Sequence, residues 1–175
     1  EALKFLPEDA HFGYAEFHNN LGLAYADDLN IDRAANLQKA IDPYGEALRF
    51  YTPQEAPFTY AMIQNSLGLV YANLLTGDRA ANLQLAINCY ENALQCFTPE
   101  TYPLEYAGTQ NNLSVAFREL PAEDRMTTLK SLACCEEALR FFTPNASPGD
   151  YAAAENNLGL VFAEVPTGDR AADVE

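Results

Sequence analysis

Residues 64–83 read QNSLGLVYANLLTGDRAANL and combine two different patterns in twenty positions. In the first half, apolar side chains recur every three to four residues (Leu67, Val70, Tyr71, Leu74), which predicts a helix with one buried face. The segment TGD then interrupts this spacing, and a second apolar series of the same period follows it (Leu83, Ile87, Tyr90, Leu94, Phe97). The stretch therefore predicts a helix, a tight turn and a second helix.

Both halves of this unit recur along the chain at a nearly constant interval. The first recurs as HNNLGLAYADDL (18–29), QNNLSVAFREL (110–120) and ENNLGLVFAEV (155–165), so that its leucine stands at 21, 67, 113 and 158. The second ends in EALRFYTP (46–53), NALQCFTP (92–99) and EALRFFTP (137–144). No stretch of the sequence alternates apolar and polar residues for long enough to predict a strand. A period of this size indicates a solenoid of stacked helix pairs, which has no single central core.

Prolines mark where the repeats meet. The residue before proline avoids the helical region, so each Thr-Pro is expected to end a second helix. A proline four residues later (Pro57, Pro103, Pro148) suits the first turn of the next helix. The expected helices are 12–28, 33–51, 58–75, 79–97, 104–120, 125–142 and 149–164, with a kink near residues 39–43 because of Pro43. This divides the chain into a single array fragment, residues 1–175, with full repeats at 12–53, 58–99 and 104–144, a preceding tail at 1–7 and a truncated repeat at 149–175.

The small and aromatic landmarks of the first full repeat carry a family resemblance. Leu21-Gly22, Tyr25, Ala40, Tyr44 and Ala47 resemble the L-G-x-x-Y and A-x-x-x-Y-x-x-A signature of the tetratricopeptide repeat (TPR). The resemblance covers nearly the whole chain, although these units have about 45 residues and the usual TPR about 34, as in long-repeat bacterial forms. It implies an all-α fold, a right-handed superhelical solenoid of antiparallel helix pairs with a concave groove.

An Asp-Arg pair opens the second helix of each unit. Asp32, Asp78, Asp124 and Asp169 stand in the N-cap position, where a carboxylate accepts bonds from free N–H groups. The following arginine opposes the helix dipole, so something must hold it. Either it forms an ion pair or bonds helix-end carbonyls across the turn, which we favour, or it belongs to an arginine row that binds an acidic partner or a phosphate. The recurrent Gly22, Gly68 and Gly159, with Ser114 as substitute, predict close approach of the paired helix.

Asparagines form two neighbouring columns on the first helices. Asparagine has poor helix propensity, so its repetition needs a cause. The TPR resemblance places these columns in the groove, where an amide can both donate to and accept from a peptide main chain. The alternative is that they bond neighbouring helices or water. The candidate groove residues are Asn19, Asn20, Asn65, Asn111, Asn112, Asn156, Asn157, Glu16, Asn73 and Arg118, with Ser66 departing from the second column. The lysine and arginine clamp of TPRs that bind chaperone tails is expected to be absent, because only Arg118 supplies a cation in the third unit.

Composition excludes several functions. With 25 acidic and 10 basic side chains, the net charge of −15 argues against nucleic acid and anionic membranes as partners. The four cysteines and two histidines show no zinc spacing, and no phosphate loop or nucleophile–base arrangement appears. We therefore expect no enzyme activity, metal or cofactor, and a cytoplasmic location. Cys89 and Cys134, at matching positions, are expected to be buried thiols.

The sequence thus favours an interaction module within a larger multidomain protein, binding a peptide or partner domain, with acidic groove residues preferring basic peptides. The alternative is a structural spacer or self-assembling solenoid without a peptide ligand. Incomplete repeats at both ends predict end-to-end self-association.

Overall fold

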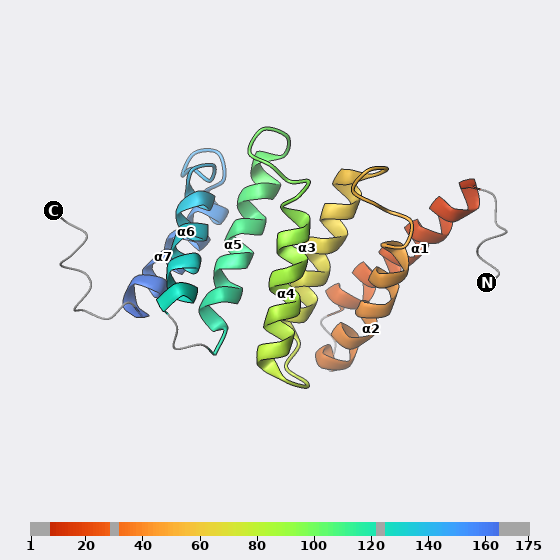
Figure 1. The fold of residues 1–175 in the computed structure, drawn as a ribbon, viewed down its shortest axis with the longest axis horizontal. Helices are drawn as coiled ribbons and strands as arrows, with labels where there is room; N and C mark the ends of the chain where they lie inside the picture. Colours follow the sequence, from red (N-terminus) through yellow and green to blue (C-terminus); the bar gives the residue numbers. More distant parts are fainter. Residues whose placement is uncertain (1–7, 29–31, 122–124, 165–175) are drawn as a thin grey trace. The chain divides into compact units, whose positions relative to one another are not determined.

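A computed structural model describes residues 8–28, 32–121 and 125–164 of the 175-residue chain. Within these residues there are seven α-helices and no strand (Figure 1). The helices are α1 (Glu8–Asp27), α2 (Arg33–Ala47), α3 (Pro57–Asn73), α4 (Arg79–Ala93), α5 (Pro103–Glu119), α6 (Arg125–Leu139) and α7 (Pro148–Glu164). None of the described helices is long and apolar enough to cross a membrane.

The helices follow the predicted series, with two systematic differences. α1 begins earlier than expected, and α2, α4 and α6 each end three to four residues before the predicted boundary. Thr-Pro is therefore not the direct stop. The chain leaves α2 through tight turns in which Phe50 and Tyr51 both donate to the carbonyl of Ala47. α2 continues through the buried Pro43; the kink stays a prediction.

The chain divides into two compact units at residue 96, and each is described by itself. In the first unit, α1 packs on α2, α3 packs on α4, and α2 also contacts α3. Its core joins Leu37, Ala40 and Tyr44 of α2 to Ile63, Leu67 and Val70 of α3. In the second unit, α5 packs on α6 and α6 on α7, with a smaller core formed by Ala107, Ala138, Phe142 and Ala154. Adjacent pairing of helices, which the repeat predicts, is confirmed in both units.

Close approach of the paired helices is confirmed at two glycines. A Cβ added to Gly22 would lie 2.7 Å from Cδ1 of Tyr44, and one added to Gly68 would lie 2.5 Å from Cε1 of Tyr90. Real Cβ atoms do not come this close, so each glycine makes room for the tyrosine ring. α5 carries Ser114 at this position, and the tyrosine position of its partner α6 is occupied by the smaller Cys135. The two changes compensate in volume.

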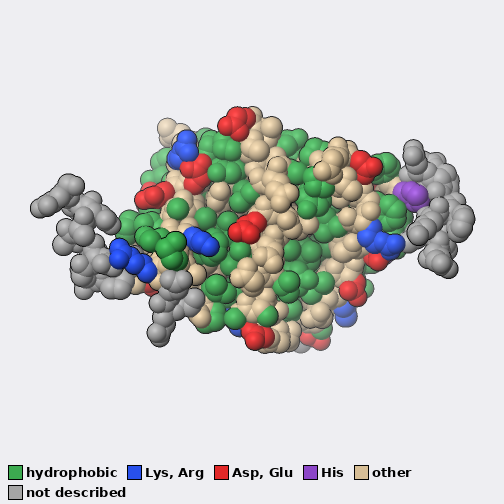
Figure 2. All heavy atoms as spheres, in the orientation of Figure 1, with side chains coloured by type: hydrophobic (Ala, Val, Ile, Leu, Met, Phe, Trp, Pro, Cys, Tyr) green, Lys and Arg blue, Asp and Glu red, His purple; other side chains and the backbone are tan. Residues whose placement is uncertain are grey.

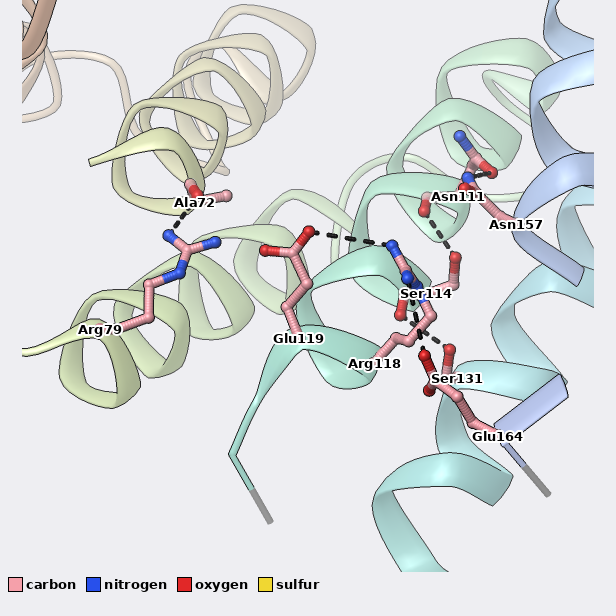
Figure 3. A network of polar contacts seen from close by, with 9 residues as sticks. All are labelled: Ala72, Arg79, Asn111, Ser114, Arg118, Glu119, Ser131, Asn157 and Glu164. Carbon is pink, nitrogen blue, oxygen red and sulfur yellow. Dashed lines mark hydrogen bonds and ion pairs between the residues drawn. The ribbon is translucent and has the colours of Figure 1, made fainter. Parts of the chain in front are cut away.

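Side chains at three repeat positions hold the turn within a helix pair. Asp32 and Asp78 accept the backbone N–H of Ala35 (3.2 Å) and Ala81 (3.1 Å), so both predicted caps are confirmed. Arg79 donates from Nη1 to the carbonyl oxygen of Ala72 (2.5 Å), in the last turn of α3 (Figure 3). For Arg79, this confirms the predicted bond to a helix-end carbonyl across the turn. Asp124 and Asp169 lie outside the described residues.

The third tie, Asn82, was missed by sequence reasoning. Its buried side-chain Nδ2 donates to the carbonyls of Leu74 (3.1 Å) and Thr76 (2.8 Å), so it closes the turn from inside. Its counterpart Asn36 is also buried and donates to the Asp28 carboxylate (3.0 Å). The recurrence of RAANL carried this signal, because asparagine otherwise has no reason to repeat at the start of a helix.

The Thr-Pro loops are local turns that lead into the next helix. The Oγ1 atoms of Thr52, Thr98 and Thr143 each accept the N–H of the residue three positions later, at 3.1–3.2 Å. Proline then opens α3, α5 and α7, where its missing N–H leaves no bond unmade.

The expectation for the cysteines is half right. All four are free thiols, and Cys89 is buried, with a pKa that burial raises to about 11. Cys134, however, is only partly buried, and its neighbour Cys135 lies in the core instead. Adjacent helix positions point about 100° apart, so only one of the two side chains can face α5.

Candidate functional site

The predicted asparagine columns lie on α1 and α3 in the first unit and on α5 and α7 in the second. We call the helix surfaces that carry Asn19, Asn20, Asn65 and Ser66, and Asn111, Asn112, Asn156 and Asn157, the asparagine faces of the two units. Asn20 and Asn156 are exposed and the others are half-buried. Some of these amides are therefore accessible to a partner, while others stand partly among neighbouring helices.

In the second unit, two asparagines bond each other across helices. Nδ2 of Asn157 in α7 donates to Oδ1 of Asn111 in α5 at 2.9 Å (Figure 3). This supports a structural role for both residues. One bond uses only part of their capacity, however, because each amide carries two N–H groups and two acceptor lone pairs.

In the first unit, Ser66 replaces the asparagine of the second column and lies near Tyr44. The Tyr44 hydroxyl is fully buried, and this burial raises its pKa to about 12, while the nearby Ser66 hydroxyl opposes the rise. The two hydroxyls do not meet in hydrogen-bond geometry, and the Tyr44 hydroxyl has no partner among the described residues. Ser66 therefore takes the place of the second-column asparagine and lies near the Tyr44 hydroxyl without forming a hydrogen bond to it.

Sequence reasoning missed a column of leucines beside the asparagines. Leu23, Leu69 and Leu160 follow the asparagines by three or four positions, so they share the same helix face. Their side chains remain 38%, 40% and 39% exposed. The third letter of the recurring LGL segment was the available signal. Each asparagine face thus combines amide groups with accessible apolar surface.

The charged candidates fall into two groups. Glu16 and Asp27 on α1 are exposed carboxylates in the first unit. In the second unit, Arg118 lies between two acids, with Nη2 3.8 Å from Glu119 and Nη1 3.7 Å from Glu164 (Figure 3). Its side chain is only 18% exposed. The cation is thus balanced by its neighbours, and the surroundings of this site carry more negative than positive charge.

Asn73 is the candidate with the clearest local role. Its Nδ2 donates to the carbonyl of Leu69, four residues earlier in α3, at 2.8 Å. The amide is exposed and turned back onto its own helix.

Charge on the visible face of the molecule is scattered. Figure 2 shows acidic and basic side chains standing apart among apolar and neutral ones, without a concentrated basic region. Among the described residues, no group of three or more His, Cys, Asp or Glu side chains is placed to hold a metal ion. The site is therefore defined by amides, leucines and carboxylates.

These features define an α-helical repeat protein built from adjacent helix pairs. Comparisons with protein-family models, curated proteins and solved structures find no match for this chain.

Proposed function

We propose that this chain is a TPR-type protein-interaction module whose asparagine faces bind an extended peptide segment of a partner protein. In this proposal the helix pairs form a right-handed superhelix with the asparagine faces on its concave side. The observation that carries it is the repetition of one chemical surface, amides beside exposed leucines, on α1 and α3 and again on α7, with the half-buried Val115 in the leucine position of α5.

Each component of that surface serves a different part of a peptide. The amides donate to and accept from the main chain, which is the same for every sequence. Leu23, Leu69 and Leu160 provide apolar contact for alternate side chains. The exposed carboxylates Glu16 and Asp27, with Glu119 and Glu164 around Arg118, favour basic side chains.

The module is a binding protein in this proposal, with no reaction of its own, and belongs to a larger multidomain protein of the cytoplasm. Four free cysteines suit a reducing compartment. The expectation that no cofactor takes part is a component of the same proposal.

A structural spacer is the second candidate, and one observation favours it. The bond between Asn157 and Asn111 uses the amides to join helices, as a solenoid without a ligand would require. The two candidate functions differ in the role they give to the exposed amides of Asn20 and Asn156. In the peptide-binding module these amides contact the ligand, whereas in a spacer they have no binding role.

The test is a peptide-array screen with the wild-type chain and the double variant Asn20→Ala, Asn156→Ala. Both positions are exposed, so the fold should be retained. Loss of two hydrogen bonds of about 0.5–1.5 kcal/mol each should weaken the strongest peptides by about tenfold. Asn88→Ala, an exposed asparagine on α4, is the matched control and should bind as the wild type. Equal binding by all three proteins, or no peptide bound by any, would leave the spacer as the function.

A further inference from the structure

Side chains follow a fixed order along the asparagine faces. On α1, Leu23 and Asp27 follow Asn19 at intervals of four residues, so all three lie along one side of the helix. α3 ends the same series with the neutral Asn73. α5 and α7 repeat the order of amide, aliphatic residue and acid in Asn111, Val115 and Glu119 and in Asn156, Leu160 and Glu164. The acids therefore lie between the asparagines and the carboxyl ends of the helices.

The opposite side of the asparagines, toward the amino ends of the helices, is mainly apolar in the first unit. The residues three and seven positions before the asparagine are Glu16 and Phe12 on α1 and Met62 and Phe58 on α3, and all four are exposed. Glu16 is the charged exception among them. α1 and α3 contact each other and run in the same direction (Figure 1), so their apolar side chains lie toward the same end of the asparagine face.

The second unit shows that the acidic side accommodates a cation. The guanidinium of Arg118 lies 3.8 Å from the carboxylate of Glu119 and 3.7 Å from that of Glu164 (Figure 3). On α1 the equivalent position is Ala26, one residue before the exposed Asp27. None of the ion pairs between described residues includes Asp27. The first unit therefore has the acid of this series without the neighbouring arginine.

An extended peptide that binds through its main chain would use the two sides separately. In a strand, the N–H and C=O groups point across the chain, and successive side chains point to opposite faces. When the main-chain groups face the asparagines, alternate side chains project to the two sides of the asparagine row. A lysine or arginine fits the side of Leu23 and Asp27, because its aliphatic stem packs on the leucine while its charge approaches the carboxylate.

We propose, on the basis of the peptide-binding function proposed above, that the asparagine face of the first unit selects an extended segment in which apolar residues alternate with lysine or arginine. The basic residues lie beside Asp27, where the negative end of the helix dipole also favours a cation. The apolar residues lie against Phe58 and Met62. Affinity depends on the order of the residues in the peptide as well as on its composition.

The experiment uses the whole chain and two labelled peptides of identical composition in fluorescence-anisotropy titrations. One peptide repeats Val-Lys four times, and the other has four valines followed by four lysines. Both carry the same charge, so non-specific attraction to the acidic chain is equal for the two. The alternating peptide should bind about tenfold more tightly, because the block peptide places only about half of its side chains on the matching side.

Two variants test which side of the face holds which residues. Asp27→Asn should weaken the alternating peptide about two- to fivefold, as expected for a solvent-exposed ion pair. Met62→Gln should also weaken it, because the apolar contact is lost. Glu91→Gln and Leu85→Gln, exposed positions on α4, are the matched controls and should bind as the wild type does. All four positions are exposed, so the fold should be retained, which circular dichroism checks.

Equal binding of the two peptides overturns the alternating pattern, and so does an effect of Asp27→Asn no larger than that of Glu91→Gln. The peptide-binding function still stands in that case if the peptides selected on the array lose affinity for the Asn20→Ala, Asn156→Ala variant. Failure of the alternating peptide to bind at millimolar concentration also overturns the pattern. The proposed function is lost with it only if the array, too, yields no bound peptide.

Discussion

Gly68 is kept small by the ring of Tyr90, whereas Gly159 has no such neighbour, so the same residue type is under opposite constraints in two repeats. Glycine in a helix interior is less favourable than alanine by about 1 kcal/mol. Its retention at Gly68 is explained by the buried ring of Tyr90, which is 1% exposed and whose Cε1 would lie 2.5 Å from an added Cβ.

We therefore expect Gly68→Ala and Gly159→Ala to change stability in opposite directions. Overpacking costs about 1–3 kcal/mol, which at Gly68 should exceed the gain in helix propensity and lower the free energy of unfolding. Gly159→Ala should raise it by up to about 1 kcal/mol. Urea denaturation of both variants measures this, and a stabilised Gly68→Ala would contradict the packing argument.

Glu46 is a residue at which pH should act. Its hydrogen bond from Arg49 (2.6 Å), aided by one from the Tyr14 hydroxyl, holds the pKa of this carboxyl below its ordinary value of 4.5. A lowered folded-state pKa contributes stability above the unfolded pKa, and this contribution is lost as the pH falls through the folded value.

Unfolding midpoints of the wild type should thus decrease between pH 5 and lower values partly because of Glu46. Glu46→Gln should be less stable at neutral pH and should lose less on acidification. The effect should be small because the group is close to solvent. Parallel pH curves for the two proteins would show that this carboxyl does not contribute.

At the scale of the elements, the turn between α3 and α4 is held by side chains as well as by chain geometry. Asp78 caps α4 from outside, while the buried Asn82 bonds two carbonyls from inside. The cap could be predicted from sequence because it lies within four consecutive residues. The two hydrogen bonds of Asn82 could not be predicted, because they depend on where the backbone of the whole turn places the two carbonyl groups.

We expect Asn82→Ala to be the more damaging of the two changes. Asp78→Ala should cost about 0.5–2 kcal/mol as a lost cap. Asn82→Ala leaves two carbonyls without their buried donor and should cost about 1–3 kcal/mol for each group that water cannot reach. Thermal unfolding compares them, with the exposed Asn88→Ala as control, which should stay within about 0.5 kcal/mol. A larger loss for Asp78→Ala would reverse this ranking.

The same scale explains why two leucines at corresponding positions of the turn sequence differ in burial. By the letters of the turn, Leu129 of AEDRMTTL matches Leu83 of TGDRAANL, yet Leu83 is fully buried and Leu129 is 43% exposed. The third repeat is one residue shorter between the turn and Ala138, and one residue rotates a helix by about 100°. The half-buried Thr128 therefore takes the position that corresponds to Leu83, and Leu129 moves off the packed face.

At the scale of the whole molecule, charge is the dominant feature. The 25 acidic and 10 basic side chains leave a net charge of −15, which repels itself in the compact state. Added salt screens this repulsion over a distance of about 10 Å at 0.1 M.

The chain should consequently become more stable as sodium chloride rises from about 10 to 500 mM at pH 7, as read from the thermal midpoint. Near the sequence pI of about 4.3 the net charge vanishes, so the salt effect should disappear there. A salt-independent midpoint at pH 7 would mean that local ion pairs already balance the charge.

The sequence by itself determined the helices, their pairing and the capped turns, because spacing, N-caps and prolines act over a few neighbouring residues. It also located the asparagine columns. Only the tertiary structure decided how their members are used: Asn157 bonds Asn111, Asn73 bonds its own helix, and Arg118 stands between two carboxylates. It also decided that Gly68 is covered and Gly159 open. These outcomes depend on which helix lies opposite a side chain, and a local pattern does not contain that information.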